Sequence, residues 1–182
     1  MSFADKFRSE VIKIFKKSNL FFRDEEFDSM EITDLGLGDF LNIGLGVIIY
    51  VNTEQVCAKE LALLPYQICP QHMHPDINNQ PGKEETFRCR YGEVYLYVPG
   101  PEIKPNKGRI PKIYNNKFNV FHEVIIKPGD QHTLAPRTWH WFQAGPCGAV
   151  LSEFSTHSFD EGDIFFDENI KRIAVDNLEK YS

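Results

Sequence analysis

The sequence is poor in the features that typify secreted, membrane and cysteine-rich proteins. It has four cysteines in 182 residues and no Cys-x-x-Cys pair, so we expect buried or half-buried thiols, without a disulfide framework or a cysteine metal site. No apolar run is long enough to cross a bilayer. The N-terminal residues carry scattered charges where a signal peptide would have an apolar core. We therefore expect a cytoplasmic protein.

An excess of positive charge is also missing. Lysine and arginine total 20 against 26 acidic residues, a formal net charge of −6, which argues against a nucleic acid as partner because that interaction needs a basic surface. Internal repeats and low-complexity segments are absent from the sequence. The length suits one domain over residues 1–182. Within it we expect an N-terminal helical arm at 1–45, a β-barrel at 46–160 and a C-terminal tail at 161–182.

Helical periodicity is confined to the two ends of the chain. Near the N-terminus, Phe7, Val11 and Ile14 recur at helical spacing with charged residues between them, which predicts an amphipathic helix over residues 4–17. One face of this helix is expected to pack on the body of the protein. Residues 169–180 predict a short C-terminal helix.

Strand signals dominate the middle of the sequence. β-Branched and apolar residues bounded by turn residues predict strands at 46–52, 60–66, 86–98, 120–126 and 148–154. We expect the third of these to be two strands joined by a turn at Tyr91–Gly92, and residues 102–116 to be a polar loop. Many short strands with helices only at the ends indicate an all-β sandwich or barrel.

Three histidines and one glutamate have the spacing of a metal site. His72 and His74 are two residues apart, so on a strand both point to the same face. Glu85 and His140 join them if their segments form neighbouring antiparallel strands. Imidazole and carboxylate donors suit Mn, Fe, Co, Ni or Zn better than Ca or Mg. With these donors, an octahedral ion keeps open positions for substrate or water.

The turns around these donors strengthen that interpretation and resemble the two motifs of the cupin superfamily. Six residues separate Glu85 from Gly92, and a Pro-Gly-Asp turn at 128–130 precedes His140. Two departures stand out, since Thr138 replaces the glycine of the second motif and the gap from His74 to Glu85 is long. The resemblance implies a jelly-roll-type β-barrel in which all four side chains bind the metal.

Longer segments resemble one family of cupins, the D-lyxose isomerases. The likeness covers roughly residues 60–172 and is carried by the segments 70–75, 81–92, 128–133, 140–145, 152–156 and 163–170. It implies a manganese-dependent aldose–ketose isomerase that interconverts D-lyxose and D-xylulose, and also D-mannose and D-fructose. It does not fix the preferred sugar. The cupin resemblance further implies a homodimer.

Two residues are expected to carry the proton transfers of such a reaction. Glu153 lies in an apolar strand, where a carboxylate binds a proton more readily, so it is the expected base. Lys83 is expected to donate to the sugar oxygens, and Asp163 is a weaker candidate for a hydrogen-bonding or lid role. The alternatives are that Glu153 is a strand-end carboxylate paired with an arginine and Lys83 an exposed loop lysine.

Strand parity gives a check on this site. If Glu85 faces the interior of the barrel, Phe87 and Cys89 do too, whereas Arg88 and Arg90 point outward. His122, His132 and His157 have no comparable spacing and are expected to be structural. Three aromatic residues flank His140: Trp139, Trp141 and Phe142. We expect them either to line a sugar-binding site or to belong to the core.

Two other functions fit a metal-binding cupin. An oxygenase would hold Fe at the same ligands and consume O₂ with its substrate. A sugar-binding module would bind a monosaccharide without turning it over.

Overall fold

The computed structural model describes residues 3–102 and 104–172. Its elements in chain order are α1 (Phe3–Phe15), η1 (Lys16–Ser18), α2 (Asp24–Asp28), β1 (Glu31–Thr33), β2 (Leu45–Asn52), β3 (Cys57–Leu63), β4 (Ile68–Met73), β5 (Glu85–Val98), η2 (Lys112–Tyr114), β6 (His122–Ile126), β7 (Gln131–Leu134), β8 (His140–Ser155), η3 (Asp160–Gly162) and β9 (Ile164–Phe165). The helix expected at 169–180 lies mainly outside the described residues, and 170–172 are irregular.

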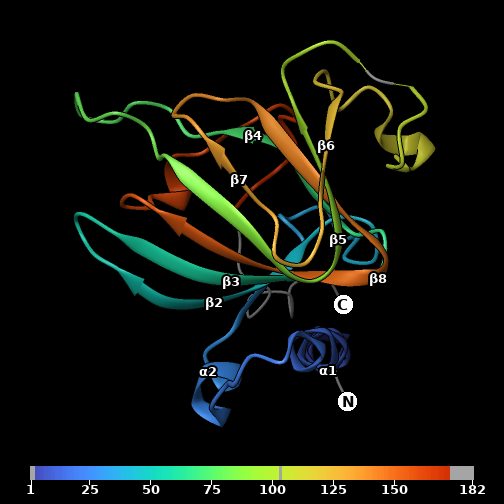
Figure 1. Ribbon diagram of the computed structural model, residues 1–182, viewed down its shortest axis with the longest axis vertical. Coiled ribbons are helices and arrows are strands. Elements are labelled where there is room, and N and C mark those ends of the chain that lie inside the picture. Colours follow the sequence, from blue (N-terminus) through green and yellow to red (C-terminus); the bar gives the residue numbers. More distant parts are fainter. Residues whose placement is uncertain (1–2, 103, 173–182) are drawn as a thin grey trace.

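One antiparallel sheet curls into the body of the protein around its longest strand, β8 (Figure 1). The first half of β8 pairs with β4 and the second half with β3, while β5 pairs with β8 along almost its whole length. The strand order β1-β2-β3-β8-β4-β9 forms the main path, and β6 and β7 pair with the two ends of β5. The predicted all-β class is confirmed.

Strand β5 corrects one expectation from the sequence. It is a single strand of 14 residues, not two strands joined by a turn at Tyr91–Gly92. Gly92 has φ +74° and lies against β8, where a Cβ atom would come within 2.0 Å of the Gly148 carbonyl oxygen. The register shifts on both sides of Gly92 show that the glycine makes a bulge at which two long strands bend together.

Several other strands differ from the prediction. Residues 60–66 were expected to form one strand, but β3 begins at Cys57 and ends at Leu63. The strands β1, β7 and β9 were not predicted, and β4 and the first half of β8 were expected only through the hypothesis that the segments of His72 and His140 are neighbouring strands. Strand β4 contains Pro70 and a run of polar residues, so it has no apolar alternation to detect.

The N-terminal helix confirms its predicted role. It lies against the outside of the curled sheet (Figure 1). Phe7, Val11 and Phe15 on one face of α1 are buried in a cluster with Ile48 and Val150 of the sheet. The helix therefore covers part of the outer face without entering the barrel.

The other two apolar clusters occupy the interior and the opposite end of the molecule. The interior cluster includes Phe87 and Cys89, as strand parity predicted, together with Phe142. In the third cluster the Trp141 ring stacks on Tyr97 with ring centroids 3.9 Å apart. Trp141 is thus a core residue and does not wall the interior cavity, whereas Phe142 does.

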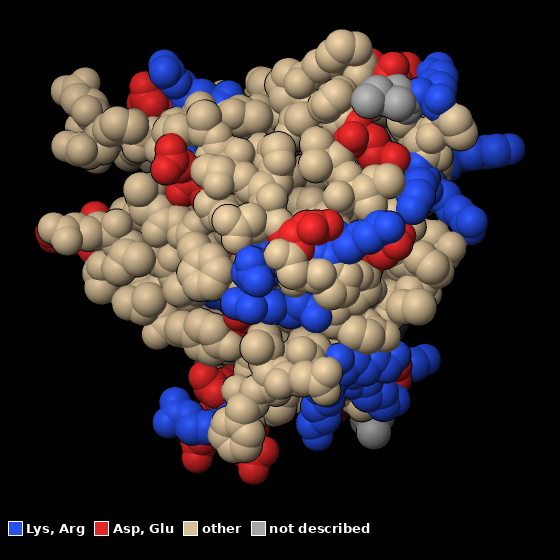
Figure 2. All heavy atoms as spheres, in the orientation of Figure 1, with Lys and Arg blue, Asp and Glu red and all other residues tan. Residues whose placement is uncertain are grey.

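Charges of both signs are dispersed over the face shown in Figure 2. Basic side chains gather over the N-terminal helix and in a short central band, and acidic side chains lie beside that band. This mixture agrees with the net charge of −6. Among the described residues, no helix is long and apolar enough to cross a membrane.

Candidate metal centre and active site

The pairing of β4 with β8 brings the predicted histidines together. His72 and His140 are direct antiparallel partners, and His74 follows just after the end of β4. The ligand atoms of all three histidines lie within 4.8 Å of one another, and all three side chains are buried. The premise that the two motifs form neighbouring antiparallel strands is therefore met.

Hydrogen bonds orient each imidazole ring. The Nδ1 atom of His72 donates to the Pro70 carbonyl at 2.8 Å, and that of His140 donates to the Thr138 carbonyl at 2.9 Å. His74 Nδ1 lies 2.5 Å from the Asp163 carboxylate. With Nδ1 engaged in all three rings, each Nε2 is the nitrogen that can offer a lone pair to a metal.

The carboxylate of Glu85 lies beside two of these Nε2 atoms. Its Oε1 is 3.2 Å from Nε2 of His74 and 2.9 Å from Nε2 of His140. Despite that short distance, Nε2 of His140 has no properly directed hydrogen bond from any described residue. Buried ligand atoms that face a common point, one of them left without a hydrogen bond, suit a shared cation. The donor set therefore fits a divalent metal.

The electrostatics of the cluster favour the protonation states that metal binding needs at His72 and Glu85, whereas His74 has to lose a proton. Burial disfavours the His74 imidazolium, but Glu85 and Asp163 outweigh it and raise the pKa of His74 to about 9, so metal binding there would release a proton. Burial, together with His140 and His74, holds the pKa of His72 well below its usual value, so this imidazole is neutral. Burial opposes ionisation of Glu85, but Lys83 and the neighbouring histidines outweigh it and hold its pKa well below the usual range. Glu85 is thus a carboxylate.

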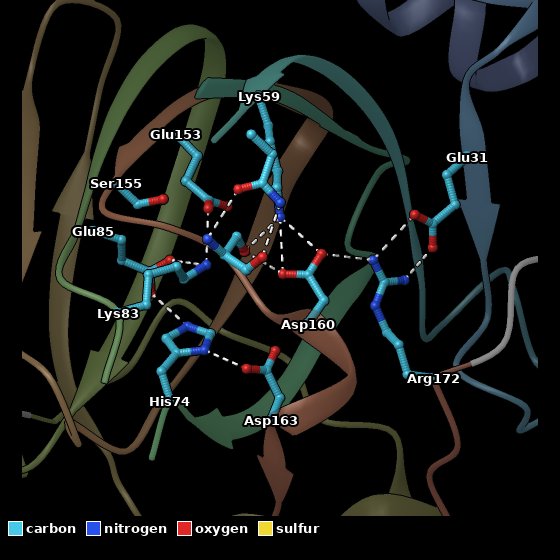
Figure 3. A network of polar contacts seen from close by, with 12 residues as sticks. Glu31, Lys59, His74, Lys83, Glu85, Glu153, Ser155, Asp160, Asp163 and Arg172 are labelled. Carbon is cyan, nitrogen blue, oxygen red and sulfur yellow. Dashed lines mark hydrogen bonds and ion pairs between the residues drawn. The ribbon is translucent and has the colours of Figure 1, made fainter. Parts of the chain in front are cut away.

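The two residues expected to act on the sugar are in contact. Lys83 Nζ lies 2.8 Å from Glu153 Oε1 and 2.8 Å from Glu85 Oε2 (Figure 3). Lys83 is buried, so the alternative of an exposed loop lysine is wrong, and the partner of Glu153 is this lysine and not an arginine. Burial disfavours the Lys83 ammonium, yet the two carboxylates raise its pKa well above the usual value.

Three further charged residues line the same cavity and were missed from the sequence. Lys59 donates to both carboxylate oxygens of Asp160, and Arg172 contacts Asp160 and Glu31 (Figure 3). A signal existed for Lys59, because it alternates with Cys57 and Leu61 on β3 and so has the parity of the barrel interior. Asp160 and Arg172 lie in irregular chain after β8, where parity gives no guidance.

The remaining histidines lie outside the cluster of donors. His122 and His157 each donate from Nδ1 to a backbone carbonyl, of Pro101 and Thr53 respectively. Arg88 bonds to Gln131 and Arg90 to Ser152, on the outer face of the sheet as parity predicted. All four cysteines are free thiols, and Cys147 is exposed.

Comparison with known proteins identifies the family. The chain is 51% identical to the D-lyxose ketol-isomerase of Thermofilum sp. over 91% of its own length and 92% of the relative's. The chain belongs to the D-lyxose isomerase family. Residues 111–179 also match the D-lyxose isomerase family model. The D-lyxose/D-mannose isomerase of Thermosediminibacter oceani is 52% identical, again over 91% of this chain and 92% of the relative.

Solved structures support the same fold. The L-ribose isomerase of Acinetobacter sp. DL28 in complex with L-ribose superposes with a TM-score of 0.73 at 14% identity, over 91% of this chain and 92% of that one. The ligand-free L-ribose isomerase of Cellulomonas parahominis gives a TM-score of 0.70 at 15% identity, over 93% of each chain. At such low identity the likeness concerns the fold, and the expected cupin barrel is confirmed.

Proposed function

We propose that this protein is an aldose–ketose isomerase that interconverts D-lyxose and D-xylulose, and D-mannose and D-fructose, by proton transfer through a cis-enediol. The observation that carries the proposal is the buried contact between Glu153 and Lys83 next to the cluster of three histidines and Glu85. The names and high identity of the relatives support the same reaction.

His72, His74, Glu85 and His140 would hold the metal, and Mn²⁺ is the ion we propose. A bound divalent ion would polarise the sugar carbonyl as a Lewis acid. His72 lies on β4 and His74 just after its end, while Glu85 and His140 lie on the paired strands β5 and β8, so the barrel itself fixes the separation of the four donors. Mn²⁺ suits nitrogen and carboxylate oxygen donors together.

The proton transfers are assigned to Glu153 and Lys83. The Glu153 carboxylate takes the proton from C2 of the open-chain aldose, which leaves the cis-enediolate anion, and returns that proton to C1 as the ketose forms. Over the same step the hydroxyl proton moves from O2 to O1. The Lys83 ammonium, 2.8 Å from Glu153, supplies a hydrogen-bond donor and a positive charge for those oxygens.

The reaction is tested with the Mn-loaded protein in D₂O against a panel of aldopentoses and aldohexoses. We expect solvent deuterium to appear at C1 of the ketose, because the proton carried by Glu153 exchanges with solvent. A hydride shift would retain all of the hydrogen originally at C2. Complete retention would contradict the mechanism, and inactivity on every aldose would contradict the function. O₂ uptake, or sugar binding without turnover, would instead indicate an oxygenase or a binding module.

The metal assignment has its own test. Titration of the metal-free protein with Mn²⁺ should show that His140→Ala and His72→Ala weaken binding well over tenfold, because even changes to residues behind the ligands cost about 10- to 100-fold. His122→Ala is the matched control and should bind Mn²⁺ normally. Unchanged affinity in both ligand variants would show that the assignment is wrong.

We further propose that the protein forms a homodimer. The outer face of the sheet supports this, since Tyr50 and Phe154 are each 46% exposed there and Arg88 and Arg90 lie nearby. Light scattering should give twice the mass of the chain, and Phe154→Asp should shift the equilibrium towards the monomer. A single-chain mass at micromolar concentration would contradict this proposal.

We also propose that the protein works in the cytoplasm. The support is chemical, because four free thiols, three of them buried, persist in a reducing compartment. Fractionation of cells that express the native protein should recover it with cytoplasmic markers.

A further inference from the structure

A groove outside the metal centre is large, has a mixed lining of apolar and polar residues, and is continuous with the site. Its volume is about 960 Å³, whereas the cavity between the metal-site residues and Lys59 has a volume of about 50 Å³. A cavity needs about 10–15 Å³ to hold one water, so the inner cavity has room for only a few atoms beyond an ion. The groove and the inner cavity share three lining residues, His74, Lys83 and Asp163. The groove is therefore the opening through which the site meets solvent.

One wall of the groove is built by the residues that lengthen the gap between His74 and Glu85. Ile77 and Gln80 exchange backbone hydrogen bonds of 3.0 and 2.9 Å across a tight turn. Both turn residues, Asn78 and Asn79, have positive φ, as a two-residue hairpin turn requires. The departure from the usual cupin spacing is therefore an ordered hairpin at the left-hand end of the barrel in Figure 1.

The facing wall comes from the segment after β8. His157 and Phe159 line the groove, and Phe159 is 50% exposed. A Cβ atom on Gly162 would lie 2.6 Å from Ile77 Cδ1 and 2.7 Å from Phe159 Cδ1. Ile77 of one wall and Phe159 of the other thus come close to each other over Gly162.

Resting on the proposed isomerase function, we infer that this groove binds the end of the sugar opposite to C1 and C2. The reacting carbons must lie at Lys83 and Glu153, and the rest of the chain exceeds the room in the inner cavity. The groove offers the amide of Gln80 and the imidazole of His157 for hydroxyl groups, and the Phe159 ring as an apolar contact. Phe159 and Gln80 then determine how well an aldose longer than a pentose is accepted.

Hydrogen exchange of the full-length, Mn-loaded protein locates the sugar directly. We expect D-mannose to slow exchange in segments 76–81 and 157–160 by at least threefold more than D-lyxose, because only the hexose carries a sixth carbon. Equal protection of the metal strands by both sugars is expected. If neither sugar protects the groove segments, the inference is wrong, whether or not the sugars are isomerised.

Steady-state kinetics provide the second arm. Phe159→Ala should raise KM for D-mannose about three- to tenfold and KM for D-lyxose less than twofold, with kcat unchanged within twofold for both. Gln80→Trp, at an exposed hairpin position, narrows the groove and should lower kcat/KM for D-mannose more than for D-lyxose. Phe21→Ala, at an exposed phenylalanine outside the groove lining, is the matched control.

The two failures are distinguishable. Loss of D-lyxose turnover in the unmodified protein would contradict the proposed isomerase function. Normal D-lyxose turnover combined with an unchanged ratio of D-mannose to D-lyxose activity in both groove variants would contradict the groove assignment alone.

Discussion

Two buried glutamates lie on opposite faces of the strand pair β3–β8 and have different partners. Glu153 faces the interior, where its carboxylate contacts the Lys83 ammonium at 2.8 Å. Glu60 faces outward, where its Oε1 accepts from the Ser152 hydroxyl at 2.5 Å and its Oε2 has no hydrogen bond from any described residue. Both residues are less than 5% exposed.

The difference shows what burial does to a carboxylate with and without a cation. Burial raises the pKa of Glu60 to about 7, and the hydrogen bond from Ser152 and the charge of Arg90 only partly oppose it. On the inner face, the strands place a lysine directly against Glu153. The outer face of the sheet therefore carries a glutamate, Glu60, that can be neutral near pH 7. The inner face carries a glutamate, Glu153, that contacts a lysine.

The largest expected difference between the two faces is in turnover. Glu153→Gln should lower kcat for D-lyxose about 10²- to 10⁴-fold, because the proposed base is removed. The Mn²⁺ affinity should stay within about threefold of the unmodified protein, since the four proposed metal donors are untouched. Glu60→Gln is the matched control on the outer face and should retain kcat. Steady-state assays and Mn²⁺ titration measure the two quantities. An equal loss of kcat in the two variants would show that Glu153 has no special role in turnover.

Removing the cation on each face should change stability by different amounts. Lys83→Met leaves Glu85 and Glu153 buried without their cation, which should lower the free energy of unfolding by about 3–5 kcal/mol. Arg90→Met removes a partly exposed donor to Ser152 and should cost about 1 kcal/mol. Urea unfolding in the presence of a chelator measures both changes in unfolding free energy. A larger loss for Arg90→Met than for Lys83→Met would contradict this prediction.

A smaller effect is expected from a carboxylate that contacts a proposed metal ligand on the inner face. Asp163→Asn weakens the contact to Nδ1 of His74 and should reduce Mn²⁺ affinity about 10- to 100-fold. Asp160→Asn, which contacts Lys59 and Arg172 but no histidine, is the control and should bind Mn²⁺ within about threefold of the unmodified protein. Calorimetric titration distinguishes the two variants, and equal affinity in both would show that Asp163 does not position His74.

The smallest effect concerns pH and the outer face. The pKa of Glu60 is higher in the folded protein, about 7, than its ordinary 4.5. The stability that comes from its protonated form is thus fully present below pH 4.5 and is lost as pH rises through 7. Relative to the unmodified protein, Glu60→Gln should therefore gain about 1–3 kcal/mol in unfolding free energy between pH 4.5 and pH 8. Chemical denaturation at the two pH values measures this gain, and a difference that is independent of pH would show that Glu60 does not titrate.

Much of the candidate metal site was predictable because its information is local. A His-x-His pair on a strand shares one face whatever the rest of the fold does, and the Pro-Gly-Asp turn that contains Gly129 indicated where the chain reverses before His140. The inward parity of Phe87 and Cys89 follows from Glu85 alone. The helix at the N-terminus was predictable for the same reason, since its periodicity lies within one short segment.

The sequence by itself determined the all-β class and the N-terminal helix, and it singled out His72, His74 and His140, which the fold brings together as a possible metal site. Tertiary structure alone decided that β5 continues through Gly92, because this depends on Gly148 of a distant strand approaching closely. It also decided that Asp160 and Arg172 join the cavity and that the residues between His74 and Glu85 build its mouth. These contacts join segments far apart in the chain, and no local pattern specifies which distant side chain will meet a given residue.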